Sequence, residues 1–446
     1  MLIPLGLKTL NKIEGKISNY NNHLIISKSI VKILFVVKNY YPSVGGTQIF
    51  FQQMAEYFVQ YFKDEIHVFT IDSLYGSEKL NYKKAGPKYE NINGVHIHRF
   101  PYWRWHIKSF IFISRVLNKL GLSVPEFITD HIVGPYSPKL KKAMIRTDAD
   151  IIVASSSNYL HMRYPLWRMK IEQRKPFLFQ GAIHFNINES RKVFTSKTLR
   201  AIQFSDVYLA NTFYEKQMLI AKKVLSEKIQ VVGCAVDCDA FKSNGQNNFK
   251  AKNNIPADAC LVGYIGRISP MKSLDILLEA MKNVWEKNKH IYLVIAGHDN
   301  DYASILQKQI NLMPMQISQQ IILLTNLDEE QKINCFHGID IFVMPSANES
   351  FGIVFLEAWA CKKPVIGAGI KAIASVIIEH EDGLLMEPGN PESLAEKILL
   401  LANNSQMRAQ LGNSGYKKVL DQYDLHAVAK KFHNICISQI NQKTCL

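Results

Sequence analysis

The sequence contains no long apolar run, and this absence excludes a membrane-spanning helix. The longest uninterrupted apolar stretches among the 446 residues are about six residues, whereas a helix needs roughly 18–20 to cross a bilayer. The first residues are also too short and too interrupted in their apolar character for a secretory signal. We therefore expect residues 1–30 to form an extension before the first strand.

Cysteines are few and scattered. The seven of them are an odd number, so a disulfide framework is not expected and reduced thiols are. Cys234 and Cys238 have neither a second pair nor flanking histidines, which argues against a zinc site. No G-x-G-x-x-G follows the first strand of either half, and this counts against a nicotinamide or flavin oxidoreductase.

Acidic residues are scarce in the first half of the chain. Residues 1–250 contain 35 Lys+Arg and 18 Asp+Glu, a net charge of +17, whereas residues 251–446 contain 18 and 20, a net charge of −2. Residues 91–125 contain no acid but five basic residues, together with Trp103, Trp105 and other aromatic residues. Such a segment favours an anionic membrane surface or an anionic acceptor, and core packing of the aromatic residues is the alternative. Nucleic acid is not expected, because no known binding module is present.

Short apolar runs alternate with helical patterns along the whole chain, which predicts parallel, doubly wound α/β sheets. A polar stretch that begins at Lys242 separates two such sets, so we expect two Rossmann-like domains that face each other across a cleft. The predicted strands are 32–37, 66–71, 95–100, 150–154, 176–180, 206–210, 229–233, 260–266, 291–296, 320–324, 341–344, 364–367 and 383–386. The predicted helices are 46–63, 110–119, 212–225, 273–288, 302–312, 329–336, 352–361, 391–402 and about 424–440.

Two glutamates, Glu349 and Glu357, are separated by seven residues and lie on either side of a predicted helix start near Gly352. The free N–H groups of that helix point into the loop that carries Glu349, and a helix N-terminus is a ready anion site. Glu357 lies about two turns further on and can face the same ligand only if that ligand is long. A nucleotide sugar has the required shape, with phosphates between sugar hydroxyls and ribose hydroxyls.

This segment resembles the E-x7-E signature of the retaining glycosyltransferases of family 4, which belong to the glycosyl transferases group 1 and have the two-domain GT-B fold. Three further segments agree in the family's order. The segment from Lys32 to Gly46 resembles its first strand and glycine-rich turn, and Gly266-Arg267 with Lys272 resembles the element that grips the diphosphate. The segment that begins at Asp382 resembles the turn before the last helices, so the resemblance covers nearly the whole chain.

The resemblance implies a donor site in the second half of the chain. Arg267 and Lys272 would stabilise the leaving diphosphate in place of a metal, Glu349 would contact the donor sugar and Glu357 the ribose hydroxyls. His184, at the end of a strand, would lie near the reacting sugar. The residues expected to approach the donor phosphates through their backbones are Gly45, Gly46, Gly266, Phe351, Gly352, Ile353 and Val354.

Several positions depart from the family's pattern. Ser273 follows Lys272 where the family usually has glycine, and Phe185 follows His184 where it often has an acid. Lys371-Ala372 stand in a loop that usually carries another diphosphate or sugar contact, which leaves the identity of the donor open. Asp237-Cys-Asp239 imitates the metal-binding D-x-D motif of a different fold, but its context predicts a linker turn, so no metal is expected.

The resemblance implies an acceptor-binding domain over residues 31–235, a donor-binding domain over 236–423, and a helix over 424–446 that crosses back to the first domain. The enzyme would move a sugar from a UDP-sugar or GDP-sugar to an acceptor hydroxyl with retention of configuration, in cell-envelope polysaccharide or glycolipid synthesis. The basic first half predicts a cytoplasmic protein that binds peripherally to the inner face of the membrane and takes a lipid-linked or other anionic acceptor. The alternatives are another GT-B enzyme, such as a nucleotide-sugar epimerase or glycan synthase, and a catalytically weakened protein that binds anionic surfaces.

Overall fold

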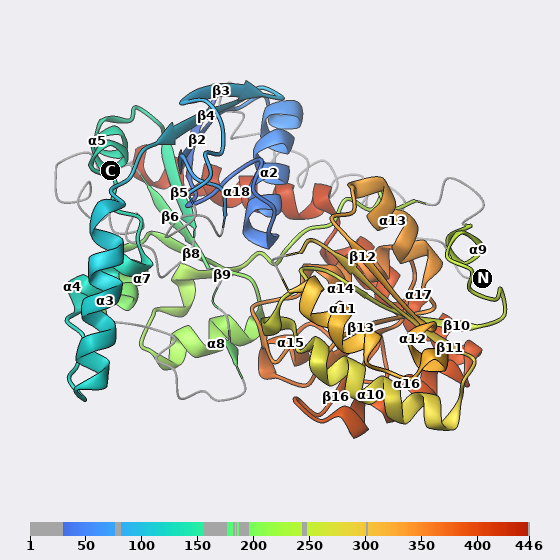
Figure 1. Cartoon of the computed structure of the whole chain (residues 1–446). Coiled ribbons are helices and arrows are strands. Elements are labelled where there is room, and N and C mark those ends of the chain that lie inside the picture. The colour runs from blue at the N-terminus through green and yellow to red at the C-terminus, as the bar shows by residue number, and fades with distance from the viewer. Residues whose placement is uncertain are drawn as a thin grey trace, which may run out of the picture.

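The computed structural model describes residues 30–75, 82–155, 176–181, 183, 185–186, 196–242, 248–299 and 302–444. The predicted extension lies almost wholly outside the described residues. The rest forms two α/β lobes, the first drawn blue to green and the second yellow to red in Figure 1, and each is built on its own mainly parallel sheet. This arrangement confirms the predicted fold class of two facing α/β sheets.

The N-terminal sheet has the strand order β3-β4-β2-β1-β5-β6-β8-β9, and all described neighbours are parallel except β3 and β4. Strands β1, β5, β6 and β8 are nearly continuous apolar runs, which is typical of parallel strands that are buried on both faces. The bounds are β1 Lys32–Val36, β2 Glu65–Ile71, β3 Tyr89–Ile92, β4 Val95–Phe100, β5 Ile151–Ser155, β6 Phe177–Gln180, β8 Val207–Ala210 and β9 Ile229–Val231.

The C-terminal sheet has the order β12-β11-β10-β13-β15-β16, which is the Rossmann order. The order reverses between β10 and β13, so the crevice at the carboxyl ends of these two strands is the place where such sheets bind ligands. The bounds are β10 Cys260–Ile265, β11 Ile291–Gly297, β12 Ile321–Thr325, β13 Ile341–Met344, β15 Val365–Ala368 and β16 Gly383–Met386. Every predicted strand is present in the two sheets, with bounds within two residues.

Helices cover both sheets, and the sequence analysis missed seven of the described ones, which lie over 126–133, 138–146, 196–204, 249–252, 315–318, 371–374 and 405–422. Among the predicted helices, α3 begins at Trp105 rather than at residue 110, and the helix predicted over 212–225 ends at Ala221. The predicted helix 46–63 changes to a π-helix over Phe58–Phe62. The helices of the N-terminal lobe are α2 Gly46–Tyr57, α3 Trp105–Lys119, α4 Glu126–Val133, α5 Pro138–Arg146, α7 Ser196–Phe204 and α8 Phe213–Ala221. Those that follow are α9 Phe249–Lys252, α10 Leu274–Lys287, α11 Ala303–Asn311, α12 Met315–Ser318, α13 Glu329–Gly338, α14 Ile353–Ala360, α15 Lys371–Ala374, α16 Pro391–Ala402, α17 Ser405–Gln422 and α18 Leu425–Thr444.

The last helix, α18, belongs to the core of the N-terminal lobe although it follows the whole second lobe in sequence. Figure 1 shows it in red beside the blue strands and α2. The ring of Phe432 stacks on Phe35 at 6.0 Å and on Phe50 at 6.1 Å between centroids, and Phe432 and Cys436 are fully buried. The first sheet therefore completes its core with the last 20 residues that the structure describes.

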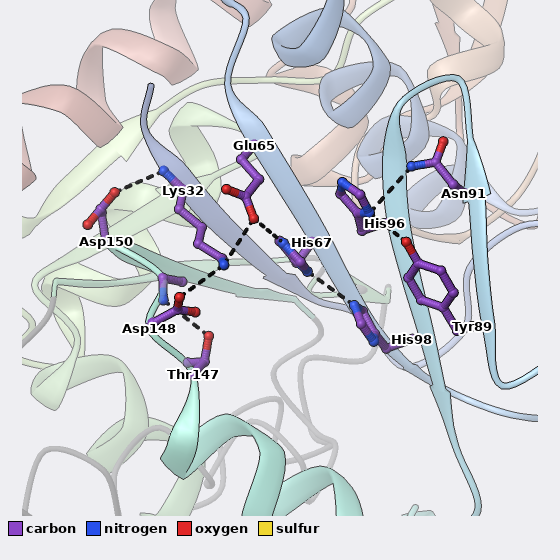
Figure 2. A network of polar contacts seen from close by, with 11 residues as sticks. Lys32, Glu65, His67, Tyr89, Asn91, His96, His98, Thr147, Asp148 and Asp150 are labelled. Atoms are coloured by element: carbon purple, nitrogen blue, oxygen red, sulfur yellow. Dashed lines mark hydrogen bonds and ion pairs between the residues drawn. The ribbon is translucent and has the colours of Figure 1, made fainter. Parts of the chain in front are cut away.

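A polar network begins at the first residues of β1 and β2 and extends to His98 of β4 (Figure 2). His67 lies at hydrogen-bond distance from His98 (3.1 Å) and from Glu65 (2.7 Å), and its ring stacks on His96. Lys32 pairs with Glu65 at 2.9 Å on the other side of His67. No group of three His, Cys, Asp or Glu side chains among the described residues is arranged to hold a metal ion, so we interpret this network as structural.

The network predicts a stability that falls in mild acid. Burial and the neighbouring His67 and His96 lower the pKa of His98 to about 4, from an ordinary value near 6.5. The unfolded chain therefore takes up a proton at this residue before the folded chain does, and stability is lost as the pH falls from about 6.5 to about 4. His98→Phe should reduce the loss of melting temperature between pH 7 and pH 5. An equal decrease in melting temperature between pH 7 and pH 5 in the wild type and the variant would show that His98 does not contribute to the acid sensitivity.

Candidate donor site

A cavity of about 810 Å³ lies between the two lobes and is lined by residues of both. In the N-terminal lobe the segment after β1, the last residue of β6 and the residue after β8 line this cavity. In the C-terminal lobe the segments that follow β10 and β13 line it. Both sheets therefore present carboxyl strand ends to one cleft, as expected for open α/β sheets. The predicted site residues that line it are Gly45, Gly46, Gly266, Arg267, Lys272, Glu349, Phe351, Gly352, Ile353, Val354 and Glu357. His184 lies outside the described residues.

Arg267 extends from the end of β10 across the cleft. Its Nη1 donates to the hydroxyl of Tyr75 at 3.3 Å, and its guanidinium lies 5.1 Å from the centroid of the same ring. The Tyr264 hydroxyl donates to the Arg267 carbonyl at 2.7 Å and so fixes the backbone from which the side chain extends. Within the described part of the chain no carboxylate pairs with Arg267, so its charge is available to an anion.

Lys272 forms an ion pair with Glu349, so two of the predicted site residues are in direct contact. Both side chains are largely shielded from solvent, with exposures of 18% and 7%. The next residue, Ser273, has a φ of 52°, in the left-handed region that favours glycine. Ser273 therefore adopts this left-handed turn in front of α10 at a small conformational cost.

Glu357 is held by a lysine that the sequence analysis did not single out. Lys332 on α13 lines the cleft and pairs with Glu357 at 3.0 Å and with Glu329 at 2.7 Å. Burial acts to lower the pKa of Lys332, but the two carboxylates outweigh it and the pKa is raised, so the lysine stays charged. The side chain of Glu357 is thereby fixed at the wall of the cleft.

The helix α14 begins at the cleft floor with no side-chain cap. Its N-cap, Gly352, has a φ of 84°, and a Cβ there would lie 2.7 Å from the ring of Phe355 and 3.0 Å from Met344. Only glycine fits this position, which leaves the first N–H groups of α14 uncovered by any described side chain. Opposite them is Gly46, where a Cβ would lie 3.2 Å from Ile353, so the two lobes approach closely at this point.

A short two-stranded ribbon joins the loops of the two lobes. β14 (Asn348–Glu349) pairs antiparallel with β7 (Phe185–Asn186), so that Glu349 lies opposite Phe185. The residue after the predicted His184 thus pairs with the residue predicted to contact the donor sugar. No sequence signal marked this contact, because strands of two residues form only where the tertiary structure brings them together.

Two segments that the sequence marked as unusual have structural roles. Ala372 in α15 is fully buried in a cluster with residues of the N-terminal lobe, and no α15 residue is among those that line the described cleft. Asp237 accepts hydrogen bonds from the N–H groups of Asp239 (3.0 Å) and Ala240 (3.2 Å) and so closes a turn. These contacts agree with the interpretation of the D-x-D sequence as a linker turn.

Comparison with known proteins agrees with this geometry. Residues 245–418 match the family described as glycosyl transferases group 1. An Anabaena protein, HepE, solved in complex with UDP, superposes with a TM-score of 0.69 at 18% identity, covering 92% of this chain and 100% of that one. The fold is GT-B. The group 1 match lies within the C-terminal half of the chain, whereas the likeness to the Anabaena structure extends over both lobes.

Two sequence relatives show how far the likeness extends. An uncharacterized glycosyltransferase of Methanocaldococcus jannaschii is 26% identical over 396 residues, which cover 86% of this chain and 92% of the relative. A capsular polysaccharide biosynthesis glycosyltransferase of Staphylococcus aureus is 21% identical over 52% of this chain and 61% of its own length.

None of the described helices is both long enough and apolar enough to span a bilayer.

Proposed function

We propose that the protein is a retaining glycosyltransferase of family 4 that moves a sugar from a nucleotide diphosphate donor to an acceptor hydroxyl. One observation carries the proposal: Arg267, Lys272 and the N-terminus of α14 line the same cleft as the two buried glutamates. The cations and N–H groups suit a diphosphate, and the glutamates suit the hydroxyls on either side of it. The domain division at about residue 236 belongs to the same proposal, with the acceptor on the first lobe and the donor on the second.

In this reaction the bond between the anomeric carbon and the diphosphate oxygen breaks, and that oxygen gains negative charge. Arg267 and Lys272 stabilise this charge, and the effect of Lys272 is strengthened because its side chain is largely shielded from solvent. The acceptor oxygen bonds to the anomeric carbon on the face that the diphosphate leaves, and its proton passes to the leaving phosphate oxygen. Glu349 and Glu357 accept hydrogen bonds from the sugar and ribose hydroxyls and set the donor's position.

The donor is identified by measuring the melting temperature with UDP-, GDP- and ADP-sugars and then following release of the nucleotide. Because the Anabaena protein was solved with bound UDP, UDP-sugars are the first donors to be tested. We expect one nucleotide class to stabilise the protein and its sugar to appear in the product with unchanged anomeric configuration by NMR. Conversion of the donor sugar without release of nucleotide would favour the epimerase, and binding without any turnover would favour the weakened binding protein.

Activity should persist in excess EDTA. Two cations and a helix N-terminus already face the diphosphate position, so fixed charge replaces a divalent ion. The measurement is the rate of nucleotide release before and after dialysis against EDTA. Complete loss of turnover that Mg²⁺ or Mn²⁺ restores would overturn the metal-independent assignment.

We further propose that the enzyme acts at an anionic membrane surface through the hairpin of α3 and α4, at the outer edge of the first lobe in Figure 1. The aromatic residues here are largely not core residues, since Trp105 is 77% exposed and Phe112 67%. Leu120, Leu122 and Phe127 add to this exposed apolar surface. The exposed basic residues of the hairpin are Arg104, Lys108, Arg115 and Lys119.

This hairpin also reaches the cleft, because Thr129, Asp130 and Val133 of α4 line it. A lipid-linked acceptor held in the bilayer would therefore be presented next to the donor. Arg99, which the sequence counted with the basic segment, is buried and paired with Glu90 at 2.7 Å, so it is not part of the surface. The Staphylococcus relative's role in capsular polysaccharide synthesis supports an acceptor of the cell envelope.

Vesicle sedimentation tests the membrane proposal. Each Lys or Arg at an anionic bilayer contributes about 1 kcal/mol, and the effect fades within a Debye length of roughly 8–10 Å. Binding to vesicles that contain phosphatidylglycerol should weaken as salt rises and should drop when Arg104, Lys108, Arg115 and Lys119 are replaced by Gln. Trp105→Ser with Phe112→Ser should also weaken it, because apolar insertion is lost.

A matched control removes the same charge from the other lobe. Lys282, Lys287, Lys289 and Lys308 are exposed on the C-terminal lobe, and their replacement by Gln should leave vesicle binding nearly unchanged. An equal loss of vesicle binding in both quadruple variants would show that binding depends on overall net charge and not on the hairpin. Equal recovery with purely phosphatidylcholine vesicles would refute an anionic requirement.

A further inference from the structure

Two residues with buried amide side chains in the N-terminal lobe belong to the lining of the cleft, and each has a buried amide oxygen without a hydrogen-bond partner. Asn39 follows β1 and is fully buried, and Gln180 ends β6 and is 3% exposed. Asn39 Oδ1 and Gln180 Oε1 are unpartnered in the described structure, and both residues line the cavity. They line the same cavity as Arg267 and Lys272, which belong to the other lobe.

The other end of each amide is already bonded, and this fixes the direction of the oxygen. Asn39 Nδ2 donates to the Ser73 carbonyl at 2.9 Å, and Gln180 Nε2 donates to Asn211 Oδ1 at 2.9 Å. Asn211 is fixed in turn, since its N–H donates to Glu215 at 2.7 Å. The two oxygens are therefore held in place before any ligand binds.

Glu215 supports this arrangement from beneath the cleft. It is fully buried and accepts a hydrogen bond from the Tyr208 hydroxyl at 2.5 Å. Burial raises the pKa of Glu215 to about 7, although its hydrogen bonds act in the opposite direction. The N–H of Asn211 bonds one carboxylate oxygen and Tyr208 the other, so the end of β8 is held rigidly next to Gln180.

A buried carbonyl oxygen without a partner is unfavourable, so two of them in residues of one cleft lining are expected where a ligand supplies the missing donors. Both atoms can only accept, so the ligand must donate. Hydroxyl groups meet this requirement, whereas a phosphate or carboxylate would be repelled by the carbonyl lone pairs. Lys38 and Asp130 line the same side, and both already have interaction partners.

We propose that Asn39 and Gln180 form the subsite for an uncharged acceptor sugar, whose hydroxyls donate to Asn39 Oδ1 and Gln180 Oε1. This inference rests on the proposed function and names the acceptor's chemistry at the cleft. The part of the acceptor next to the donor is a neutral polyol, and any anionic part of the acceptor lies outside, toward the basic α3–α4 hairpin. Arg267 and Lys272 are thereby left to the donor diphosphate alone.

The test compares transfer from UDP-glucose, or whichever nucleotide sugar proves active, to methyl glycopyranosides and to their 6-phosphates. The wild type should use at least one neutral glycoside with a kcat/KM at least ten times that for its phosphate. Asn39→Leu and Gln180→Met should each raise the KM for that glycoside by roughly 10–100-fold, the value of one or two hydrogen bonds to a substrate hydroxyl. The Kd for UDP and the slow hydrolysis of the donor by water should stay within about twofold of the wild type.

Gln53 provides the matched control. Its Oε1 is also buried and unpartnered, but Gln53 does not line the described cleft, so Gln53→Met should leave the acceptor KM unchanged. If Asn39→Leu fails to fold, Gln180→Met alone decides. Unchanged KM in the folded variants, preference for the phosphorylated glycosides, or no use of any neutral glycoside while donor hydrolysis proceeds would each overturn the subsite. A wild type that binds and consumes no nucleotide sugar would instead overturn the proposed function.

Discussion

Arg267→Ala should turn over the donor about 10²–10³ times more slowly than the wild type, the loss seen when one oxyanion-stabilising donor is removed. The effect should fall mainly on kcat, because the charge on the leaving diphosphate is greater in the transition state than in the bound donor. The protein should still fold, since the side chain is only partly buried and has no described carboxylate partner to leave unpaired. The rate of nucleotide release at saturating donor measures the loss of kcat, and the melting temperature measures whether the variant still folds.

Lys272→Ala should lose a similar factor but should also melt at a lower temperature, because it leaves the buried Glu349 without its partner. Combining Lys272→Met with Glu349→Gln removes both charges and should restore much of the melting temperature without restoring turnover. Lys287→Ala, on the exposed side of α10, is the control and should be neutral in both measurements. Near-normal turnover in both Arg267→Ala and Lys272→Ala would contradict their assignment to the diphosphate.

Trp359→Ala should destabilise the protein by about 3–5 kcal/mol, the usual cost of truncating a fully buried tryptophan. Trp359 lies on α14, the helix whose N-terminus faces the cleft. Its Nε1 donates to the Asp382 carbonyl at 2.8 Å, and the Lys418 ammonium lies 5.2 Å from its ring. The variant therefore creates a cavity between α14 and α17 and leaves a buried carbonyl unpaired.

The urea midpoint followed by far-UV circular dichroism is the suitable readout, because it does not depend on the removed fluorophore. Trp105→Ala is the matched control and should shift the midpoint little, since that side chain is 77% exposed. Trp359→Phe should fall between the two, because it keeps most of the volume but loses the hydrogen bond. A midpoint in Trp359→Ala equal to that of Trp105→Ala would mean that α14 is held by other contacts.

The two sheets could be predicted because strands that are buried on both faces appear in the sequence as short apolar runs between helical patterns. The start of α14 was predictable for a different reason, since Gly352 in front of an apolar helix marks a backbone that only glycine adopts. One available signal was missed. Asn93-Gly94, both with positive φ, form the tight turn between β3 and β4, and this dipeptide is a strong hairpin signal.

Other features could not be obtained from local patterns. Lys332 stands three residues after Glu329 on a helix, which indicates an ordinary surface pair, and only the folding of α13 against α14 brings it to Glu357. The ribbon of Glu349 and Phe185 joins residues of two different lobes and depends on how the lobes meet. The free oxygens of Asn39 and Gln180 likewise depend on which neighbours take up the other end of each amide.

The position of α18 sets an order of events during synthesis of the chain. The second lobe, up to the end of α17, has left the ribosome before Phe432 does, so it can fold while the first lobe still lacks part of its interior. Before Phe432 has been synthesised, the ring faces of Phe35 and Phe50 on which it stacks lack this contact. The first lobe is therefore most prone to aggregation before α18 has been synthesised and packed against it.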